Sequence, residues 1–267
     1  RPLWTFSFTA PGLVAGQAMP VDEAGSPAGA LFDRPLPDDA RELLLHNPLH
    51  VGSVLVRRSW QEKAGFFDES LRSYEDWDMW LRLARLGCPM ASVARPVSLY
   101  RFHAAQMTRD GSQMTTATFA VLDKSFADPD LPPSWRAWRN RAYSRAHLRA
   151  AAQAYRLEES LSVARIHLEK AVALDPTLAA GSGERLATTM SAWTDLPKIG
   201  DPLTYLERIY DNLPSCLQSL GARRREVLGG AAMRQAFSAA RDGDLSRARR
   251  ALYRALQYQP RWLANRG

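Results

Sequence analysis

The stretch that decides the fold of the first half of the chain is residues 75–86, which read EDWDMWLRLARL. Its apolar residues recur at spacings of three and four, so they form one stripe along a helix: Trp77, Trp80, Leu81 and Ala84. Gly87 follows directly and is typical of a helix end. Glu75 and Asp76 fall in the first turn, where the helix dipole favours a carboxylate. The stretch therefore predicts a helix that is fixed to a core and begins with two acids.

Short apolar segments separated by turns lie on both sides of this helix. The segments predicted to be strands or extended are residues 13–16, 51–56, 91–97 and 99–103. Further short helices are predicted over residues 38–46, 60–64 and 110–126. Pro27, Pro35 and Pro37 discourage helix between the first strand and residue 38. The mixture predicts an α+β first part.

The second half of the chain has a different character. From Ser134 onward strand patterns are scarce and Ala, Leu and Arg are frequent, which predicts an all-helical region. Residues 161–176, LSVARIHLEKAVALDP, align without a gap with residues 245–260, LSRARRALYRALQYQP, at an offset of 84 residues. Both copies carry small alanines that let helices pack closely and a proline that stops the helix. An Ala-rich helix pair with a terminal proline resembles the tetratricopeptide repeat.

Charge also divides the chain near residue 124. Residues 1–124 carry 13 Lys and Arg against 14 Asp and Glu, a net charge of −1, whereas residues 125–267 carry 22 against 14, a net charge of +8. We therefore expect two domains with these bounds. A basic half can favour acidic lipids or nucleic acid. Because no compact nucleic-acid motif is present, we interpret the arginines as solvated helix faces and expect no nucleic-acid partner.

Two further features bear on the compartment. Cys88 and Cys216 lie far apart and lack metal-ligand spacing, which fits a reducing compartment and indicates neither a disulfide framework nor a zinc site. No apolar run reaches the roughly 18 residues of a membrane span. Because the chain starts at Arg1 rather than Met, we expect a fragment, in which the absence of a signal peptide means little.

Four motifs between residues 50 and 103 together resemble a known enzyme family. They are HVGSVLVRR at residues 50–58, GFFDE at residues 65–69, YEDWDMWLRL at residues 74–83 and YRFH at residues 100–103. In this order they are similar to the C-terminal, acceptor-side half of inverting family-2 glycosyltransferases of the GT-A fold. The resemblance covers about residues 12–120. It implies an incomplete GT-A-type α/β domain, α+β in this chain, followed by the all-α tetratricopeptide-like region.

The resemblance gives roles to residues that the pattern alone leaves open. It implies that Asp76 is the general base for an acceptor hydroxyl, with Glu75 as its companion; either acid could also be a helix cap. Gly52 is implied to lie beside the donor and acceptor sugars, because glycine lets a ligand approach the backbone; a plain turn is the alternative. Trp77 and Trp80 are interpreted either as core residues or as a sugar-stacking surface.

Two residues are implied to act on the donor diphosphate. His103 resembles the family's C-terminal histidine, which helps to hold a divalent metal, Mn²⁺ or Mg²⁺; the alternative is a surface or core histidine. Arg101 could neutralise a phosphate or pair with an acid. Nothing upstream of Gly16 supplies the family's Asp-x-Asp motif or its nucleotide-binding half. We therefore expect this chain alone to be inactive.

The implied function is transfer of a sugar from a nucleotide-sugar donor to a glycan or lipid-linked acceptor. The resemblance suggests cell-surface polysaccharide or glycoprotein assembly, in the cytoplasm at the inner face of a membrane. The helical half could contact a protein partner or form a homodimer. The competing hypothesis is a helical-repeat module that offers a concave groove to a peptide or another chain and has no catalytic activity.

Overall fold

The computed structural model describes residues 10–103, 111–196 and 199–264. The chain divides into two compact units, Arg1–Ala146 and His147–Gly267. Each unit has its own cluster of buried apolar residues. Helix α5 (Arg139–Ala154) carries the boundary between them. The first unit therefore extends beyond residue 124 and includes the first helices after the change in charge.

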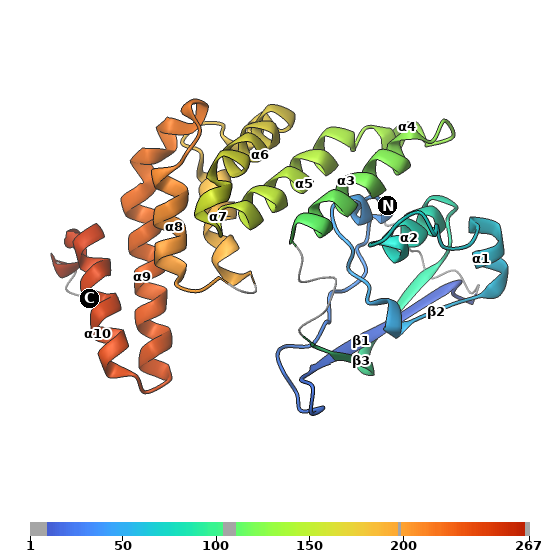
Figure 1. Cartoon of the computed structure of the whole chain (residues 1–267), viewed down its shortest axis with the longest axis horizontal. Coiled ribbons are helices and arrows are strands. Elements are labelled where there is room, and N and C mark those ends of the chain that lie inside the picture. The colour runs from blue at the N-terminus through green and yellow to red at the C-terminus, as the bar shows by residue number, and fades with distance from the viewer. Residues whose placement is uncertain (1–9, 104–110, 197–198, 265–267) are drawn as a thin grey trace. The chain divides into compact units, whose positions relative to one another are not determined.

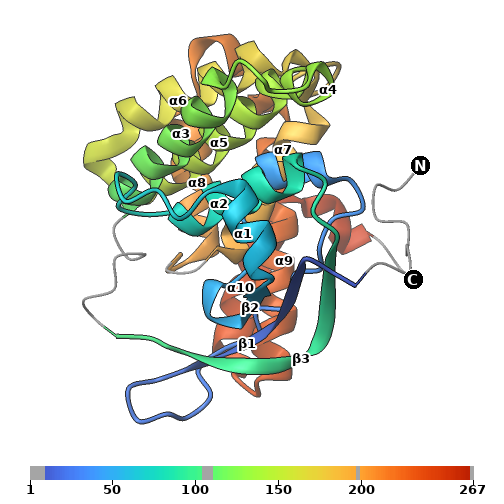
Figure 2. The ribbon, with the colours of Figure 1, turned by 90° about the vertical axis from the view of Figure 1, so that its right-hand side faces the viewer.

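The first unit contains a three-stranded sheet, whose strands lie side by side in Figures 1 and 2. In the order β2-β1-β3, they are β2 (Val54–Val56), β1 (Leu13–Val21) and β3 (Met90–Arg101). β2 pairs antiparallel to β1, with Leu13 opposite Val56, and β3 pairs parallel to β1, with Leu13 opposite Met90. Most β3 side chains after Met90 are exposed, so the sheet contributes to the core mainly through β1.

The other elements of the first unit are helices and 3-10 turns, and α1 to α4 lie above the sheet in the view of Figure 1. They are α1 (Arg58–Ala64), α2 (Glu75–Arg85), α3 (Gly111–Ala127) and α4 (Pro133–Arg136), with 3-10 helices at Ala40–Leu44 and Val51–Ser53. α2 supplies the largest buried side chains, Trp77 and Trp80, which share the core with Leu43 and Leu122. Trp77 Nε1 donates a hydrogen bond to the Leu43 carbonyl oxygen at 2.7 Å, so its indole is fully accommodated inside the unit.

The described part of the second unit contains helices and no strand. After α5 come α6 (Leu161–Leu174), α7 (Glu184–Ala192), α8 (Pro202–Asp211), α9 (Arg224–Arg241) and α10 (Leu245–Tyr258). Short 3-10 helices connect or follow them at Glu158–Ser160, Pro176–Leu178, Trp193–Asp195, Ser215–Arg223 and Pro260–Ala264. Within residues 10–103, 111–196 and 199–264, none of the helices has the length and apolar character that crossing a membrane requires.

The structure confirms the α+β part followed by a helical region, and the predicted helix at residues 75–86 is α2. The predicted strand at residues 51–56 is wrong in its first half, because Val51–Ser53 form a 3-10 turn and only Val54–Val56 pair with β1. The extended segments at residues 91–97 and 99–103 form a single strand, because pairing with β1 continues past Pro96 after a shift in register. The first residue of the helix expected over residues 110–126 lies outside the described residues.

Candidate functional site

The residue that precedes helix α2 has an unusual backbone conformation. Tyr74, which precedes its first residue, has φ 61° and ψ 23°, in the left-handed region. A side chain makes this conformation cost roughly 1–2 kcal/mol. The ring of Tyr74 packs edge-on against Trp77, with ring centroids 5.3 Å apart, and this contact anchors the residue. Backbone strain of this kind is concentrated at functional sites, and here it lies directly before Glu75 and Asp76.

Both oxygens of the Asp76 carboxylate accept hydrogen bonds. The backbone N–H of Trp77 donates to Asp76 Oδ1 at 2.6 Å, and Asn47 Nδ2 donates to Asp76 Oδ2 at 3.2 Å. The side chain is half-buried. Burial raises the pKa of Asp76, the neighbouring charge of Glu75 raises it further, and the two hydrogen bonds act in the opposite direction. Each oxygen keeps a lone pair that can accept a further proton donor.

Asn47 is a site residue that the sequence analysis did not identify. It precedes Asp76 by 29 residues and follows the 3-10 helix Ala40–Leu44. Its Oδ1 accepts a hydrogen bond from the backbone N–H of Leu49 at 3.1 Å, so the amide is held with its Nδ2 toward Asp76. In the sequence, Asn47 and Pro48 indicate only a break in the chain. An amide at such a break is a weak signal, because its partner is far away along the chain.

Gly52 lies in a turn that packs against a histidine. A Cβ atom at Gly52 would lie 3.0 Å from His50 Cε1, so any side chain there would press on the imidazole. Ser53 Oγ lies 2.6 Å from Ser98 Oγ, which ties this turn to β3. Gly52 is itself exposed. The turn therefore combines an accessible backbone with a packing reason for glycine, and both interpretations of Gly52 fit these contacts.

His50 belongs to an aromatic cluster that the sequence analysis also missed. Phe32 stacks on its ring with centroids 5.9 Å apart, and Tyr100 packs edge-on at 4.8 Å. Phe102 extends the cluster by packing edge-on against Tyr100 at 5.2 Å. Burial lowers the pKa of His50, and its buried Nδ1 has no hydrogen-bond partner in the described part of the chain. The ring is therefore neutral at pH 7, while Phe32 and Phe102 expose ring surface to solvent.

The residues expected at the donor diphosphate occupy the end of β3. Arg101 Nη1 donates hydrogen bonds to the carbonyl oxygens of Asp22 and Glu23, at 3.1 and 2.6 Å, so it braces the turn after β1. His103 follows β3 and is exposed. No group of three or more His, Cys, Asp or Glu that could hold a metal ion occurs among the described residues. His103 therefore belongs to no such group in the described part of the chain, and the expected divalent metal stays a prediction.

Trp77 and Trp80 lie in the core. Trp77 is 1% exposed, and Trp80 is also buried. A sugar stacks on an aromatic ring only where one face of the ring is open. The packing of both rings therefore favours the core interpretation.

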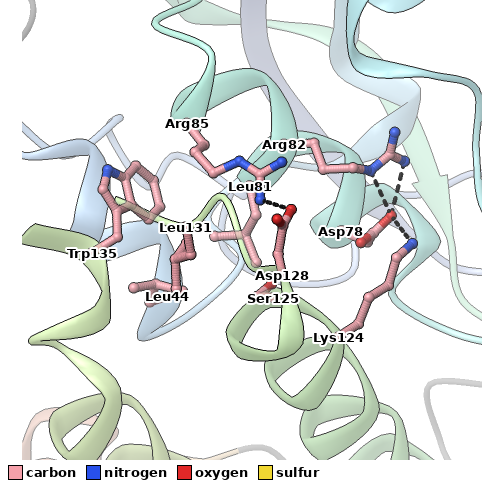
Figure 3. Close-up of a pocket in the computed structure, with 10 residues that line it drawn as sticks. All are labelled: Leu44, Asp78, Leu81, Arg82, Arg85, Lys124, Ser125, Asp128, Leu131 and Trp135. Atoms are coloured by element: carbon pink, nitrogen blue, oxygen red, sulfur yellow. Dashed lines mark hydrogen bonds and ion pairs between the residues drawn. The ribbon is translucent and has the colours of Figure 1, made fainter. Parts of the chain in front are cut away.

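Figure 3 shows a small cavity beside α2, and the charged side chains that line it form ion pairs with one another. Asp78, whose side chain is 2% exposed, accepts hydrogen bonds from Arg82 Nε and Lys124 Nζ, both at 2.9 Å. Arg85 pairs with Asp128. The cavity volume is about 40 Å³, which is room for a water molecule rather than a sugar. This network of ion pairs joins α2 to α3. In the sequence, only the i,i+4 spacing of Asp78 and Arg82 indicates it.

The structure brings some of the predicted site residues together. Glu75 and Asp76 share the first turn of α2, whereas Gly52 lies in the 3-10 helix before β2 and Arg101 is the last residue of β3. Within the residues that the structure describes, no hydrogen bond or ion pair joins Asp76 to Gly52, Arg101 or His103. A search of protein-family models found no match to this chain, and searches of curated proteins and of solved structures found none either.

Proposed function

We propose that the first unit is the acceptor side of an inverting glycosyltransferase, in which Asp76 is the general base. The observation that carries the proposal is the state of this carboxylate, which is half-buried at the start of α2, raised in pKa and hydrogen-bonded by Asn47. A general base is more effective when its pKa is closer to the working pH while it remains ionised. An ordinary helix cap requires neither the burial nor the distant amide.

The proposed reaction is a single displacement. The oxygen of an acceptor hydroxyl attacks the anomeric carbon of the donor sugar and forms the new glycosidic bond. The bond from that carbon to the diphosphate breaks, and its electron pair leaves with the nucleoside diphosphate. The hydroxyl proton passes to the Asp76 carboxylate, because the oxygen is a poor nucleophile while protonated. Attack from the face opposite the leaving group inverts the anomeric configuration.

Asn47 and Glu75 support this role through the carboxylate, and we assign the acceptor surface to the aromatic cluster around His50. Asn47 fixes the rotation of the carboxylate, and Glu75 increases its proton affinity through like-charge repulsion. Asn47 lies three residues before His50 in the sequence, and His50 belongs to the cluster in which Phe32 and Phe102 expose ring surface. Exposed rings of this kind suit the apolar face of a sugar.

The donor and its divalent metal are a separate part of the proposal. A divalent ion would neutralise the diphosphate as it leaves. Because the described residues contain no group of three possible ligands, we assign no step to the ion. The proposal limits the first unit to acceptor binding and removal of the proton, and we expect no transfer by residues 1–267 alone.

The test is sugar transfer by the Asp76→Asn variant of the longest chain that the gene encodes, assayed with Mn²⁺, a panel of nucleotide sugars and glycan acceptors. Removing a general base lowers kcat by roughly 10²–10⁴-fold and leaves the acceptor KM nearly unchanged. The matched control is Glu62→Gln, which neutralises an exposed acid on α1 and should transfer at the wild-type rate. Wild-type transfer by Asp76→Asn would overturn the role of Asp76.

A second candidate function is a helical-repeat interaction module without catalysis. The observation that favours it is the exposure of large apolar side chains on α10, among them Leu245 and Leu252. The same Asp76→Asn variant separates the two functions, because it should leave partner binding unchanged.

A further inference from the structure

Two histidines meet between helices α5 and α6 of the second unit, and the proposed transfer reaction uses neither of them. His147 belongs to α5 and His167 belongs to α6, and their Nδ1 atoms are 2.8 Å apart. The ring centroids are 5.1 Å apart, and the ring planes are tilted by 41°. Both side chains are half-buried. The contact is therefore a hydrogen bond between two titratable groups that come from different helices.

The two helices are packed through alanines beside this pair. Ala151 of α5 lies one turn after His147, and it is fully buried. Ala164 and Ala171 of α6 lie one turn before and one turn after His167, and they are also fully buried. The three alanines belong to one core cluster. Because small side chains at a contact let helix axes approach closely, little space is left for the two rings to move apart between the helices.

The internal repeat indicates that helix packing alone does not require a histidine at this place. The two copies align at an offset of 84 residues, so the equivalent of His167 is Ala251. Ala251 is buried where α10 packs along α9. A small apolar side chain therefore satisfies the packing at this position of the repeat. What the imidazole of α6 adds is a hydrogen bond and a group that can take up a proton.

One proton can lie between the two Nδ1 atoms, but two cannot. In a neutral imidazole one ring nitrogen is a donor and the other is an acceptor, so one Nδ1–H donates to the other Nδ1. A first added proton is compatible with this hydrogen bond, because an imidazolium Nδ1–H can still donate to a neutral ring. A second added proton makes both Nδ1 atoms donors. The contact then becomes repulsive.

The surroundings oppose the charge on both rings. Burial lowers the pKa of His167, and burial together with the charges of His167 and Lys170 lowers the pKa of His147 to about 4. Because these pKa values lie below the ordinary 6.5, protonation opposes folding. The loss of stability is absent above pH 6.5, grows as pH falls towards 4 and is complete below the lowered pKa.

Lys170 is the charged side chain that acts on both rings. It lies three residues after His167, on the same face of α6. The other charged residues near the pair lie two positions from a histidine, which places them on other faces of the two helices; they are Arg145, Arg149, Arg165 and Glu169. Tyr143, one turn before His147, stays neutral in this range because burial and Asp123 raise its pKa. A second proton on the pair therefore adds to the charge of Lys170.

We propose that His147 and His167 form an acid-sensitive contact, which joins α5 to α6 while one proton lies between the rings and opens this helix pair when both rings are protonated. The geometry of the contact carries the proposal, since the two rings come from helices that are closely packed beside them. The inference does not depend on the transferase proposal, because it uses no residue assigned to that reaction.

The test is hydrogen exchange of the full chain, read by mass spectrometry at pH 7 and at pH 4 and corrected for the intrinsic exchange rate at each pH. It compares the wild type with His167→Gln, in which an amide keeps a hydrogen-bond partner for His147 but takes up no proton. At pH 4, α6 and the part of α5 after His147 should exchange at least about fivefold faster in the wild type than in the variant. At pH 7 the two proteins should exchange at similar rates.

Two further variants and a second measurement make the result specific. His167→Ala supplies the residue that the second copy carries, and it should resist acid as His167→Gln does. His103→Gln removes an exposed histidine of the first unit and should keep the wild-type response of α6. Nuclear magnetic resonance of the imidazole Cε1–H groups should show two separate titration steps for the wild-type pair and a single step at a higher pH for His147 in His167→Gln.

Two results would overturn the proposal. The first is equal exchange of α6 in the wild type and His167→Gln at pH 4. The second is a two-step titration of the rings with no faster exchange in α5 or α6, which would show that the charged rings turn outward into water while the helices stay together. If His167→Gln is already unfolded at pH 7 by circular dichroism, His167→Ala and the reciprocal variant His147→Gln provide the same comparison.

Discussion

A carboxylate at a helix start can act as a cap or as a base, and Asp76 differs from an ordinary cap in its surroundings. Its Oδ1 accepts a hydrogen bond from the next backbone N–H, and its Oδ2 accepts one from a side chain 29 residues away. The residue before the acidic pair, Tyr74, adopts a left-handed conformation. Local helix formation requires neither the hydrogen bond from Asn47 nor the left-handed conformation of Tyr74. Both features therefore reflect tertiary structure around the carboxylate.

Asp76→Asn should make the protein slightly more stable at pH 7. The folded-state pKa of Asp76 is raised above the ordinary 3.8, chiefly by burial, so ionisation opposes folding. This free-energy penalty is absent below the ordinary pKa. It grows as pH rises from the ordinary pKa to the raised folded-state pKa, and it is complete above that value. Because the side chain is only half-buried, the gain in the free energy of unfolding should be under about 1 kcal/mol.

Urea unfolding of wild type and Asp76→Asn at pH 7 and at pH 3 measures this difference. The difference between the free energies of unfolding of the two proteins at each pH removes the effect of the other carboxyl groups. The variant should be the more stable protein at pH 7, and the two should converge at pH 3. A variant that is less stable at pH 7 would show that Asp76 serves mainly as a cap.

The sequence located this carboxylate but not its neighbours. The acids at residues 75 and 76 could be placed in a first helical turn because the apolar stripe of α2 has a clear period. Asn47 and His50 could not be assigned to the site, because their contacts depend on how distant segments pack. For the same reason the sequence left two interpretations of Trp77 open, which only its burial against Leu43 separates.

At the scale of the element, α6 and α10 show that similar sequences can occupy different environments. Both copies form helices, Leu161–Leu174 and Leu245–Tyr258, and in both the next 3-10 turn begins at the shared proline. These bounds follow from local sequence, since proline disfavours helix in the residue before it. The different exposure of Leu168 and its equivalent Leu252 does not follow from local sequence, because it depends on which other helices lie beside each copy.

The equivalent substitutions Leu168→Ala and Leu252→Ala should therefore differ in cost. Leu168 is fully buried, so its truncation leaves a cavity and should lower the free energy of unfolding by about 2–5 kcal/mol. Leu252 is 42% exposed, so its truncation should cost less than about 1 kcal/mol. Urea unfolding followed by circular dichroism compares the two variants. Similar losses of unfolding free energy at both positions would mean that Leu252 of α10 is already covered in solution.

At the scale of the whole molecule, the chain has two buried clusters with separate memberships. One contains residues from Leu13 to Ala146, and the other contains residues from Leu148 to Ala255. The shift from mixed to helical patterns predicted two regions, and the change in charge suggested a boundary near residue 124. Composition could not predict that the end of α3, α4 and the start of α5 belong to the first compact unit, because Phe126, Trp135 and Ala142 join its core through tertiary packing.

Two separate cores imply that damage to one should leave the other largely intact. Leu122→Ala removes a fully buried side chain of the first core, and the cavity should cost about 2–5 kcal/mol. Hydrogen exchange read by mass spectrometry should then be faster in α2 and β1 and unchanged in α8 and α9. The reciprocal variant, Leu168→Ala, should speed exchange in α8 and α9 and spare α2. Faster exchange in both units from either variant would show that they open as one cooperative unit, because local openings are confined to the elements that share a core.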